Sequence, residues 1–265
     1  MLDQATPSFI QAGARRLECR WFGAPSPDRP TLVFLHEGLG CVSLWKNFPE
    51  RVAAATDLAA FVYSRAGYGA SDAAELPRAV RYMHDEGLAV LPEVLAAAGI
   101  GDCVLIGHSD GASISLIAAG AGRVPGLRGL ILLAPHVFNE TVCVASIREA
   151  AVAYRENPRL REGLARYHGE QVDDAFWGWN DIWLHPDFWH WNIEEYLSTI
   201  AQPLLLIQGE ADQYGTTRQL DAIEAQVRGP HQRVLIPKAR HSPHHDAPEE
   251  TLNAIEAFLG RIQAL

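Results

Sequence analysis

The sequence has few features that would tie it to redox chemistry, a metal or a nucleic acid. Its four cysteines (Cys19, Cys41, Cys103 and Cys143) are scattered and form no C-x-x-C pair. We therefore expect reduced, structural thiols, as in a cytoplasmic protein. The formal net charge of −10 at pH 7 argues against nucleic acid and anionic membranes as partners. There is no H-E-x-x-H motif, and we expect neither a metal nor any other cofactor.

Long apolar runs are also missing. No stretch is long enough to predict a transmembrane helix, and the first residues lack the basic and apolar regions of a signal peptide. We find no internal repeat and no low-complexity segment. The 265 residues, of which 48% are hydrophobic, are enough for one large domain with a sizeable core. Because nucleic acids and anionic membranes are disfavoured as partners, we expect the partner to be a small-molecule substrate.

Apolar stretches typical of buried strands alternate with stretches of helical spacing. We expect an antiparallel hairpin over 8–23 and further strands at 31–36, 59–64, 102–105, 129–135, 202–207 and 233–236. We expect helices at 43–55, 79–98, 112–119, 217–227 and 248–263. This alternation predicts an α/β fold, in which a mostly parallel central sheet carries helices on both faces.

Residues 137–200 interrupt the alternation, because they contain no clear strand. Residues 146–168 predict one or two amphipathic helices with a break near Asn157-Pro158, and residues 172–196 hold five of the seven tryptophans. We interpret 137–200 as a helical cap inserted between 1–136 and 201–265, which together form the core. Such an insertion should lie at the carboxyl edge of the sheet, where ligands bind in open α/β folds.

Ser109 lies in the motif Gly107-His108-Ser109-Asp110-Gly111, between a predicted strand and a predicted helix. This is the G-x-S-x-G pattern of a nucleophile elbow, a sharp turn that exposes the serine hydroxyl. Glycine tolerates the strained dihedrals of such a turn. The N-terminus of the following helix carries unpaired N–H groups and partial positive charge beside the serine.

With this motif and the insertion, the chain resembles the α/β-hydrolase superfamily over nearly its whole length. The triad of that superfamily follows the order Ser, acid, His, so the resemblance implies Ser109 as nucleophile, Asp212 as acid and His241 as base. A serine hydroxyl needs a base to take its proton, and the resulting imidazolium needs a carboxylate. The alternatives nearby are Glu210 and Asp246 for the acid, and His244 and His245 for the base.

The resemblance also implies an oxyanion hole, which needs two N–H groups. The amide of Asp110 is one. The sequence His36-Glu37-Gly38-Leu39-Gly40 is similar to the H-G-x-x-G loop of the superfamily, which implies Gly38 as the second donor, with Leu39 as the alternative. Glu37 stands where the superfamily has glycine. We expect the side chains of Glu37 and Asp110 to point away from the hole, and their charges to disfavour anionic substrates.

These residues predict a serine hydrolase that cleaves a small to medium, largely apolar carboxylic ester, with a thioester also open. The candidates for substrate contacts are Trp177, Trp179 and Trp183 in the cap, and His136. Two other functions remain open. One is hydrolysis of a carbon–carbon bond, as in the meta-cleavage-product hydrolases. The other is a small-molecule receptor built on a hydrolase fold.

Overall fold

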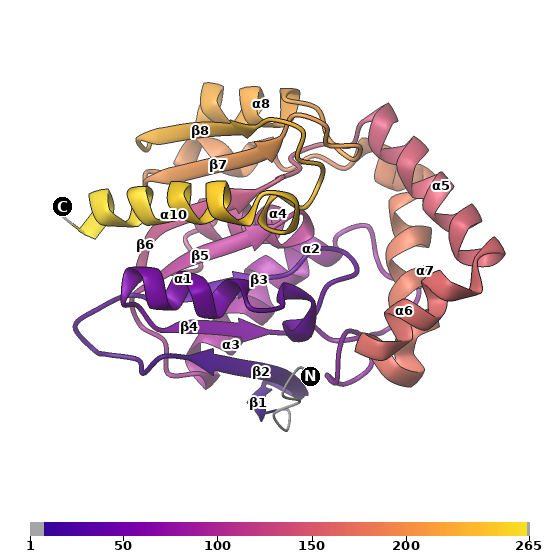
Figure 1. Cartoon of the computed structure of the whole chain (residues 1–265), viewed down its shortest axis with the longest axis horizontal. Coiled ribbons are helices and arrows are strands. Elements are labelled where there is room, and N and C mark those ends of the chain that lie inside the picture. Colours follow the sequence, from indigo (N-terminus) through magenta and orange to yellow (C-terminus); the bar gives the residue numbers. More distant parts are fainter. Residues whose placement is uncertain (1–7, 264–265) are drawn as a thin grey trace.

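The computed structural model describes residues 8–263, and its centre is an eight-stranded sheet (Figure 1). Residues 1–7, which bear on the expectation of no signal peptide, and residues 264–265 lie outside this range. The strands are β1 (Ser8–Ala12), β2 (Arg15–Phe22), β3 (Thr31–Leu35), β4 (Ala60–Tyr63), β5 (Cys103–His108), β6 (Leu127–Leu133), β7 (Leu204–Gly209) and β8 (His231–Ile236). Their order is β1-β2-β4-β3-β5-β6-β7-β8. The pairings β1–β2 and β2–β4 are antiparallel and the other five are parallel, which confirms the predicted hairpin and mostly parallel sheet.

The helices connect these strands much as predicted. The α-helices are α1 (Phe48–Thr56), α2 (Tyr82–Asp85), α3 (Leu91–Ala97), α4 (Asp110–Gly120), α5 (Thr141–Glu156), α6 (Pro158–His168), α7 (Val172–Trp183), α8 (Arg218–Gln226), α9 (Pro243–Asp246) and α10 (Pro248–Gln263). The 3-10 turns are η1 (Val42–Trp45), η3 (Gly169–Gln171), η4 (Pro186–His190) and η5 (Glu194–Thr199), and η2 (Glu86–Val90) is a π turn. The helix predicted over 79–98 is therefore divided into α2, η2 and α3.

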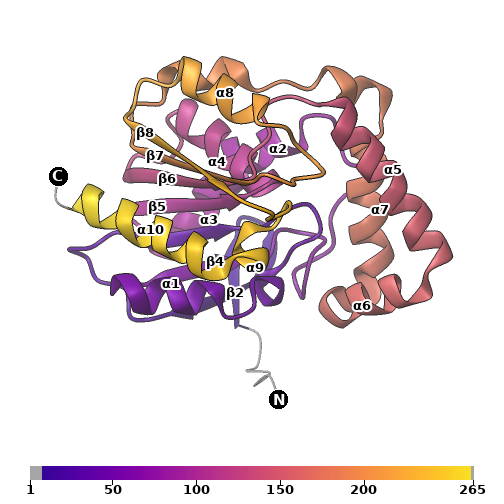
Figure 2. The same ribbon diagram turned by 45° about the horizontal axis from the view of Figure 1, so that its top comes forward.

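Helices cover the sheet on both faces because successive side chains of each strand point to opposite sides. On β3, Val33 and Leu35 belong to the same hydrophobic cluster as residues of α3, α4 and α8, whereas Leu32 and Phe34 belong to a second cluster with residues of α1 and α10. Figure 2 shows α1 and α10 on one side of the sheet and α4 and α8 on the other. Every residue of β3 and β4 is buried, as expected for strands in the middle of an α/β sheet.

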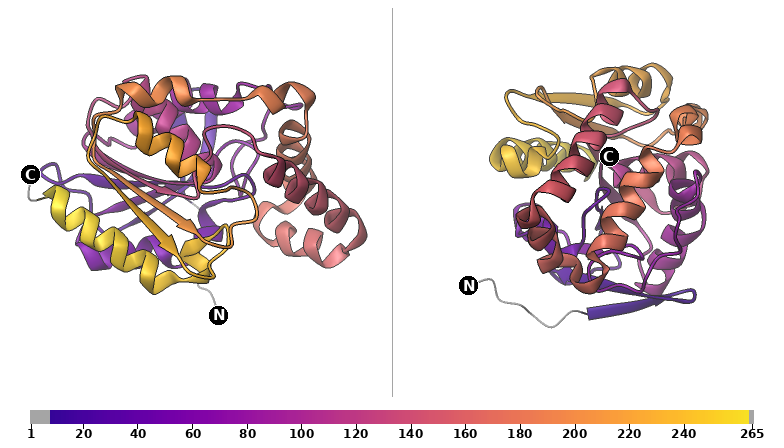
Figure 3. Two further views of the ribbon diagram at one scale, coloured as in Figure 1. Left: turned by 90° about the horizontal axis from the view of Figure 1, so that it is seen from above. Right: turned by 90° about the vertical axis from the view of Figure 1, so that its right-hand side faces the viewer.

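Residues 137–200, here called the helical segment, lie between β6 and β7 and contain α5, α6 and α7. They form no strand beyond an isolated bridge between Phe138 and Asn192. The three helices stand together beyond one end of the sheet (Figures 1 and 3). The predicted break is confirmed at Asn157, whose side chain accepts a hydrogen bond from the N–H of Arg159 and caps α6. Pro158 disfavours helical dihedrals at the residue before it.

None of the helices within residues 8–263 combines the length and the apolar character that crossing a membrane requires.

Candidate active site

Ser109 occupies a strained turn between β5 and α4. Its φ of 51° and ψ of −116° lie in a region that residues with a side chain rarely adopt. A Cβ at Gly111 would collide with the Leu35 carbonyl, and a Cβ at Gly107 would collide with the first turn of α4. Both flanking positions therefore require glycine, and the tight packing fixes Ser109 at the end of β5.

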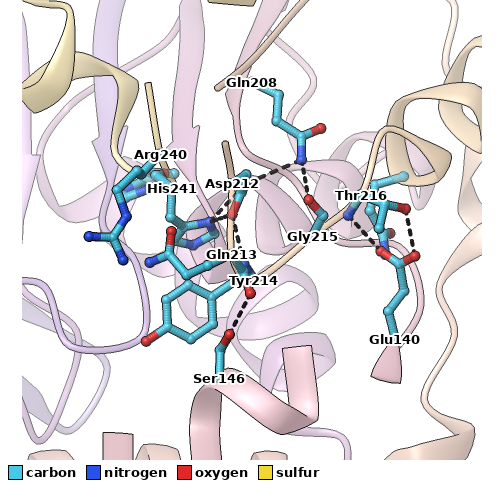
Figure 4. A network of polar contacts seen from close by, with 12 residues as sticks. Glu140, Ser146, Gln208, Asp212, Gln213, Tyr214, Gly215, Thr216, Arg240 and His241 are labelled. Carbon is cyan, nitrogen blue, oxygen red and sulfur yellow. Dashed lines mark hydrogen bonds and ion pairs between the residues drawn. The ribbon is translucent and has the colours of Figure 1, made fainter. Parts of the chain in front are cut away.

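Asp212 follows β7 and His241 follows β8, and their side chains meet (Figure 4). His241 and Ser109 line the same cavity. His241 Nδ1 lies 2.9 Å from Oδ1 and 3.1 Å from Oδ2 of Asp212. An ionised carboxylate only accepts, so Nδ1 carries the hydrogen and a neutral His241 keeps a lone pair on Nε2. A histidine held in this tautomer can take a proton from a hydroxyl at its Nε2.

The Asp212 carboxylate is buried and fully paired. Its side chain is only 2% exposed, and it also accepts hydrogen bonds from the Tyr214 N–H at 2.8 Å and Gln208 Nε2 at 3.1 Å. Burial raises the pKa of Asp212, but the charge and hydrogen bond of His241 and the Tyr214 N–H outweigh burial and lower this pKa to about 2. Asp212 is therefore ionised and oriented by donors on both oxygens.

The alternative acids and bases lie elsewhere. Glu210 is exposed, and Asp246 accepts a hydrogen bond from the Arg240 N–H. The rings of His244 and His245 lie 4.1 Å apart at a tilt of 42°, and neither residue lines the cavity that Ser109 and His241 share. Within residues 8–263, no three His, Cys, Asp or Glu side chains are gathered as a metal site would require.

Residues 37–40 after β3 form a β-turn, here called the oxyanion turn, which is closed by a hydrogen bond from the Gly40 N–H to the Glu37 carbonyl at 3.1 Å. The Glu37 carbonyl also accepts from Arg65 Nη2 at 3.0 Å. In a trans peptide the carbonyl and the next N–H point in opposite directions, so the Gly38 N–H points away from Arg65. Gly38 and Leu39 both line the cavity beside Ser109. Arg65 thus fixes the direction of the peptide that carries the Gly38 N–H.

Asp110 begins α4, and its side chain turns into the core. The carboxylate accepts a hydrogen bond from the Tyr82 hydroxyl at 2.6 Å and lies 3.7 Å from the Arg65 guanidinium. Trp183 Nε1 in turn donates to the Tyr82 hydroxyl at 3.1 Å. The negative charge of Asp110 is therefore offset within the core, while its backbone N–H remains at the start of α4 beside Ser109.

The side chain of Glu37 lies next to His108, the residue before the nucleophile. Its carboxylate lies over Gly40, 3.5 Å from His108 Nδ1, and its side chain keeps 29% of its surface exposed. His108 Nε2 donates to the His241 carbonyl at 2.8 Å, since a carbonyl can only accept. Burial raises the pKa of Glu37, but His108 and His36 outweigh it and hold this pKa well below its ordinary value. The Glu37 carboxylate thus lies beside His108, and His108 holds the backbone of His241.

The cavity beside Ser109 and His241 has a volume of about 190 Å³. The helical segment supplies Trp179 and Trp183, and His136 lies at the end of β6. Burial, with His241 nearby, lowers the pKa of His136 to about 4, so this side chain is neutral near pH 7. Trp177 is not brought into the cavity. It lies on the other side of α7, where the Arg155 guanidinium stacks 4.7 Å from its ring.

Five further residues, which the sequence did not single out as site residues, line the cavity: Cys143, Ile147, Gln213, Tyr214 and Ser242. Cys143 and Ile147 share one face of α5 because they are one helical turn apart. The periodicity of α5 could have pointed to them had its start been placed at Thr141 rather than at Ser146. Tyr214 lies two residues after Asp212, and no pattern in the sequence distinguishes it from any loop tyrosine.

Comparison with known proteins places the chain among hydrolases. A family model described as the alpha/beta hydrolase family matches residues 32–254. No curated protein sequence matches the chain. Among solved structures, an esterase from Thermogutta terrifontis with malate bound is similar at a TM-score of 0.73 and 18% identity, over 97% of this chain and 99% of that one.

Two other solved structures are similar. MGS-M2, an alpha/beta hydrolase enzyme from a Medee basin deep-sea metagenome library, has a TM-score of 0.76 at 15% identity, over 96% of this chain and 97% of that one. Proline iminopeptidase from Mycobacterium smegmatis has a TM-score of 0.68 at 19% identity, over 97% and 98%. At these identities the likeness is one of fold.

Proposed function

Because the chain belongs to the alpha/beta hydrolase family, we propose that it is a serine hydrolase of small to medium, largely apolar carboxylic esters. The observation that carries the proposal is the convergence of three residues. Ser109 at its strained turn and His241, hydrogen-bonded to the buried Asp212, line one cavity. This arrangement is the one that acyl transfer through a serine requires.

In the proposed reaction, Ser109 Oγ attacks the ester carbonyl while His241 Nε2 takes its proton. The alcohol leaves with that proton, and an acyl-enzyme remains on Ser109. Water, activated by His241, then attacks the acyl-enzyme and releases the acid. Asp212 holds the His241 tautomer, and the N–H groups of Gly38 and Asp110 stabilise the oxyanion.

The dimensions of the cavity support a short acyl group. Its volume of about 190 Å³ is roughly six times the share of a water molecule in the liquid. Trp179, Trp183, Tyr214 and Ile147 give it a largely apolar wall. In this proposal residues 137–200 act as the cap that closes over the substrate, and 1–136 and 201–265 form the hydrolase core. A thioester of similar size fits the same chemistry.

The test is a panel of p-nitrophenyl esters of rising acyl length, assayed beside a thioester and a 2-hydroxy-6-oxo-dienoate, with Ser109→Ala as the matched control. We expect the acetate and butyrate esters to be cleaved fastest and Ser109→Ala to be inactive. Faster cleavage of the dienoate would identify a carbon–carbon hydrolase instead. Tight binding of a small molecule with no turnover on any substrate would identify a receptor.

A further inference from the structure

His168, at the end of α6, connects the helical segment to the oxyanion turn. Its side chain is buried, and its Nε2 donates a hydrogen bond to the Leu39 carbonyl at 2.9 Å. Its Nδ1 accepts from the Gly69 N–H at 3.0 Å. Because a carbonyl only accepts and an N–H only donates, these two bonds fix both the tautomer and the orientation of the ring.

The bond to Leu39 completes the fixation of the oxyanion turn. At one end, the Glu37 carbonyl accepts from Arg65 Nη2 at 3.0 Å. At the other end, the Leu39 carbonyl is held by His168. The 37–38 peptide carries the Gly38 N–H, which the turn's own hydrogen bond does not engage, and the 39–40 peptide carries the Gly40 N–H that makes this bond to the Glu37 carbonyl. Arg65 and His36 therefore hold the peptide that carries the Gly38 N–H. His168 holds the next peptide but one, which closes the turn, so loss of His168 lets the turn, and the Gly38 N–H with it, rotate.

We propose that His168 is a positioning residue for the oxyanion hole, supplied by the helical segment. This inference rests on the proposed function, since it assumes that the turn stabilises an oxyanion. A donor must lie about 2.7–3.1 Å from the oxyanion to be effective, so a small rotation of the turn weakens it. Burial lowers the pKa of His168, which keeps the ring neutral and Nδ1 free to accept.

Three variants separate positioning from packing. His168→Gln retains one donor and one acceptor at the end of a side chain of similar length. His168→Asn retains an acceptor near Gly69 but is too short to reach the Leu39 carbonyl. His190→Asn is the matched control, because His190 is exposed on η4.

The readout is the second-order rate of covalent labelling of Ser109 by an alkyl fluorophosphonate, followed by mass spectrometry. In this reaction Ser109 Oγ forms a bond to phosphorus, fluoride leaves, and His241 takes the proton. The rate depends on the nucleophile and the oxyanion hole but on no particular ester. Thermal unfolding of each variant and the KM and kcat for p-nitrophenyl acetate are measured alongside.

We expect His168→Asn to lower the labelling rate about ten-fold, part of the roughly 10²–10³-fold loss for removing a donor outright. His168→Gln should restore most of the rate, His190→Asn should leave it unchanged, and the loss on p-nitrophenyl acetate should fall on kcat rather than KM. A wild-type labelling rate in His168→Asn would overturn the inference. So would equal losses of labelling rate in His168→Asn and His168→Gln that follow a fall in melting temperature.

If His168→Asn does not fold, His168→Met fills the same space without a donor and replaces it in the comparison with His168→Gln. A wild-type protein that is not labelled at Ser109 would overturn the proposed function together with this inference. Labelling of the wild type with no effect at His168 would overturn this inference alone.

Discussion

Asp212→Asn keeps the size of the side chain but converts one of its two acceptors into a donor. If the new NH2 group replaces Oδ2, it faces Gln208 Nε2, and if it replaces Oδ1, it faces the Tyr214 N–H. Gln208 cannot turn over without loss, because its Nε2 also donates to the Gly215 carbonyl at 2.7 Å. Either orientation therefore leaves two donors facing each other in a buried site.

The size of the effect follows from these contacts. A buried donor without a partner costs about 1–3 kcal/mol of stability. The larger effect is on turnover, because asparagine no longer holds His241 in the tautomer with hydrogen on Nδ1. In Ser-His-Asp sites such a change lowers kcat by roughly 10⁴, and we expect a fall of that order on p-nitrophenyl butyrate.

The assay measures kcat on this ester together with urea unfolding, for Asp212→Asn and for the controls Glu210→Gln and Asp246→Asn. Both controls should keep wild-type turnover, since neither carboxylate contacts His241. Turnover of Asp212→Asn within ten-fold of wild type would refute the assignment of the acid. So would a severe loss in either control.

The same variant tests the pH dependence of stability. The pKa of Asp212 is lowered from 3.8 to about 2 in the folded chain, so the unfolded chain takes up a proton there first as the pH falls. The stabilisation is present above about pH 4 and is lost as the pH falls to 2, and at 1.36 kcal/mol per unit it is about 2 kcal/mol. Between pH 5 and pH 2.5 the free energy of unfolding should fall by about 1.5 kcal/mol more in the wild type than in Asp212→Asn, since the other carboxylates contribute to both proteins. Equal losses in both would contradict it.

Further substitutions test the nucleophile, the pocket wall and the two acidic residues. Ser109→Ala should lower ester turnover by about 10⁴–10⁶-fold with the melting temperature unchanged. Turnover at the wild-type rate in this variant would exclude Ser109 as the nucleophile. Trp183→Ala should change the ranking of acyl lengths, whereas Trp177→Ala should not, because Trp183 lines the cavity and Trp177 does not. Equal changes in the two variants would contradict this. Glu37→Gln should raise kcat/KM on a carboxylate-bearing ester about ten-fold relative to the neutral ester. Asp110→Asn should leave that ratio unchanged, because its charge is already offset in the core.

The strands, most helices and the elbow could be predicted because their signals are local. The run from Cys103 to Ala119 carries an apolar strand, two glycines at a tight turn and a helix of small residues. The start of α5 was missed, since residues 141–145 are rich in β-branched side chains that favour helix only weakly. The first turn of α5 is helical because Cys143 and Val144 are buried there.

Other features depend on contacts between distant residues and could not be predicted. The π turn at 86–90 places Gly87 against the Ile114 carbonyl of α4, a position where a Cβ would come within 2.9 Å. Trp177 and Trp179 are two residues apart on α7, so only one of them can face the cavity, and the sequence does not say which face docks. The approach of Glu37 to His108 likewise brings together residues from different parts of the chain, the loop after β3 and the end of β5.

The most direct test of the proposed mechanism is the mass of the protein during turnover. Wild type and Ser109→Ala are mixed with p-nitrophenyl butyrate, quenched in acid within milliseconds to seconds, and mapped by peptide mass spectrometry. We predict one butyryl group on the peptide containing Ser109, transient in the wild type, and no such adduct in Ser109→Ala. Continued release of p-nitrophenol with no acyl group on Ser109, or an acyl group on another residue, would contradict the mechanism.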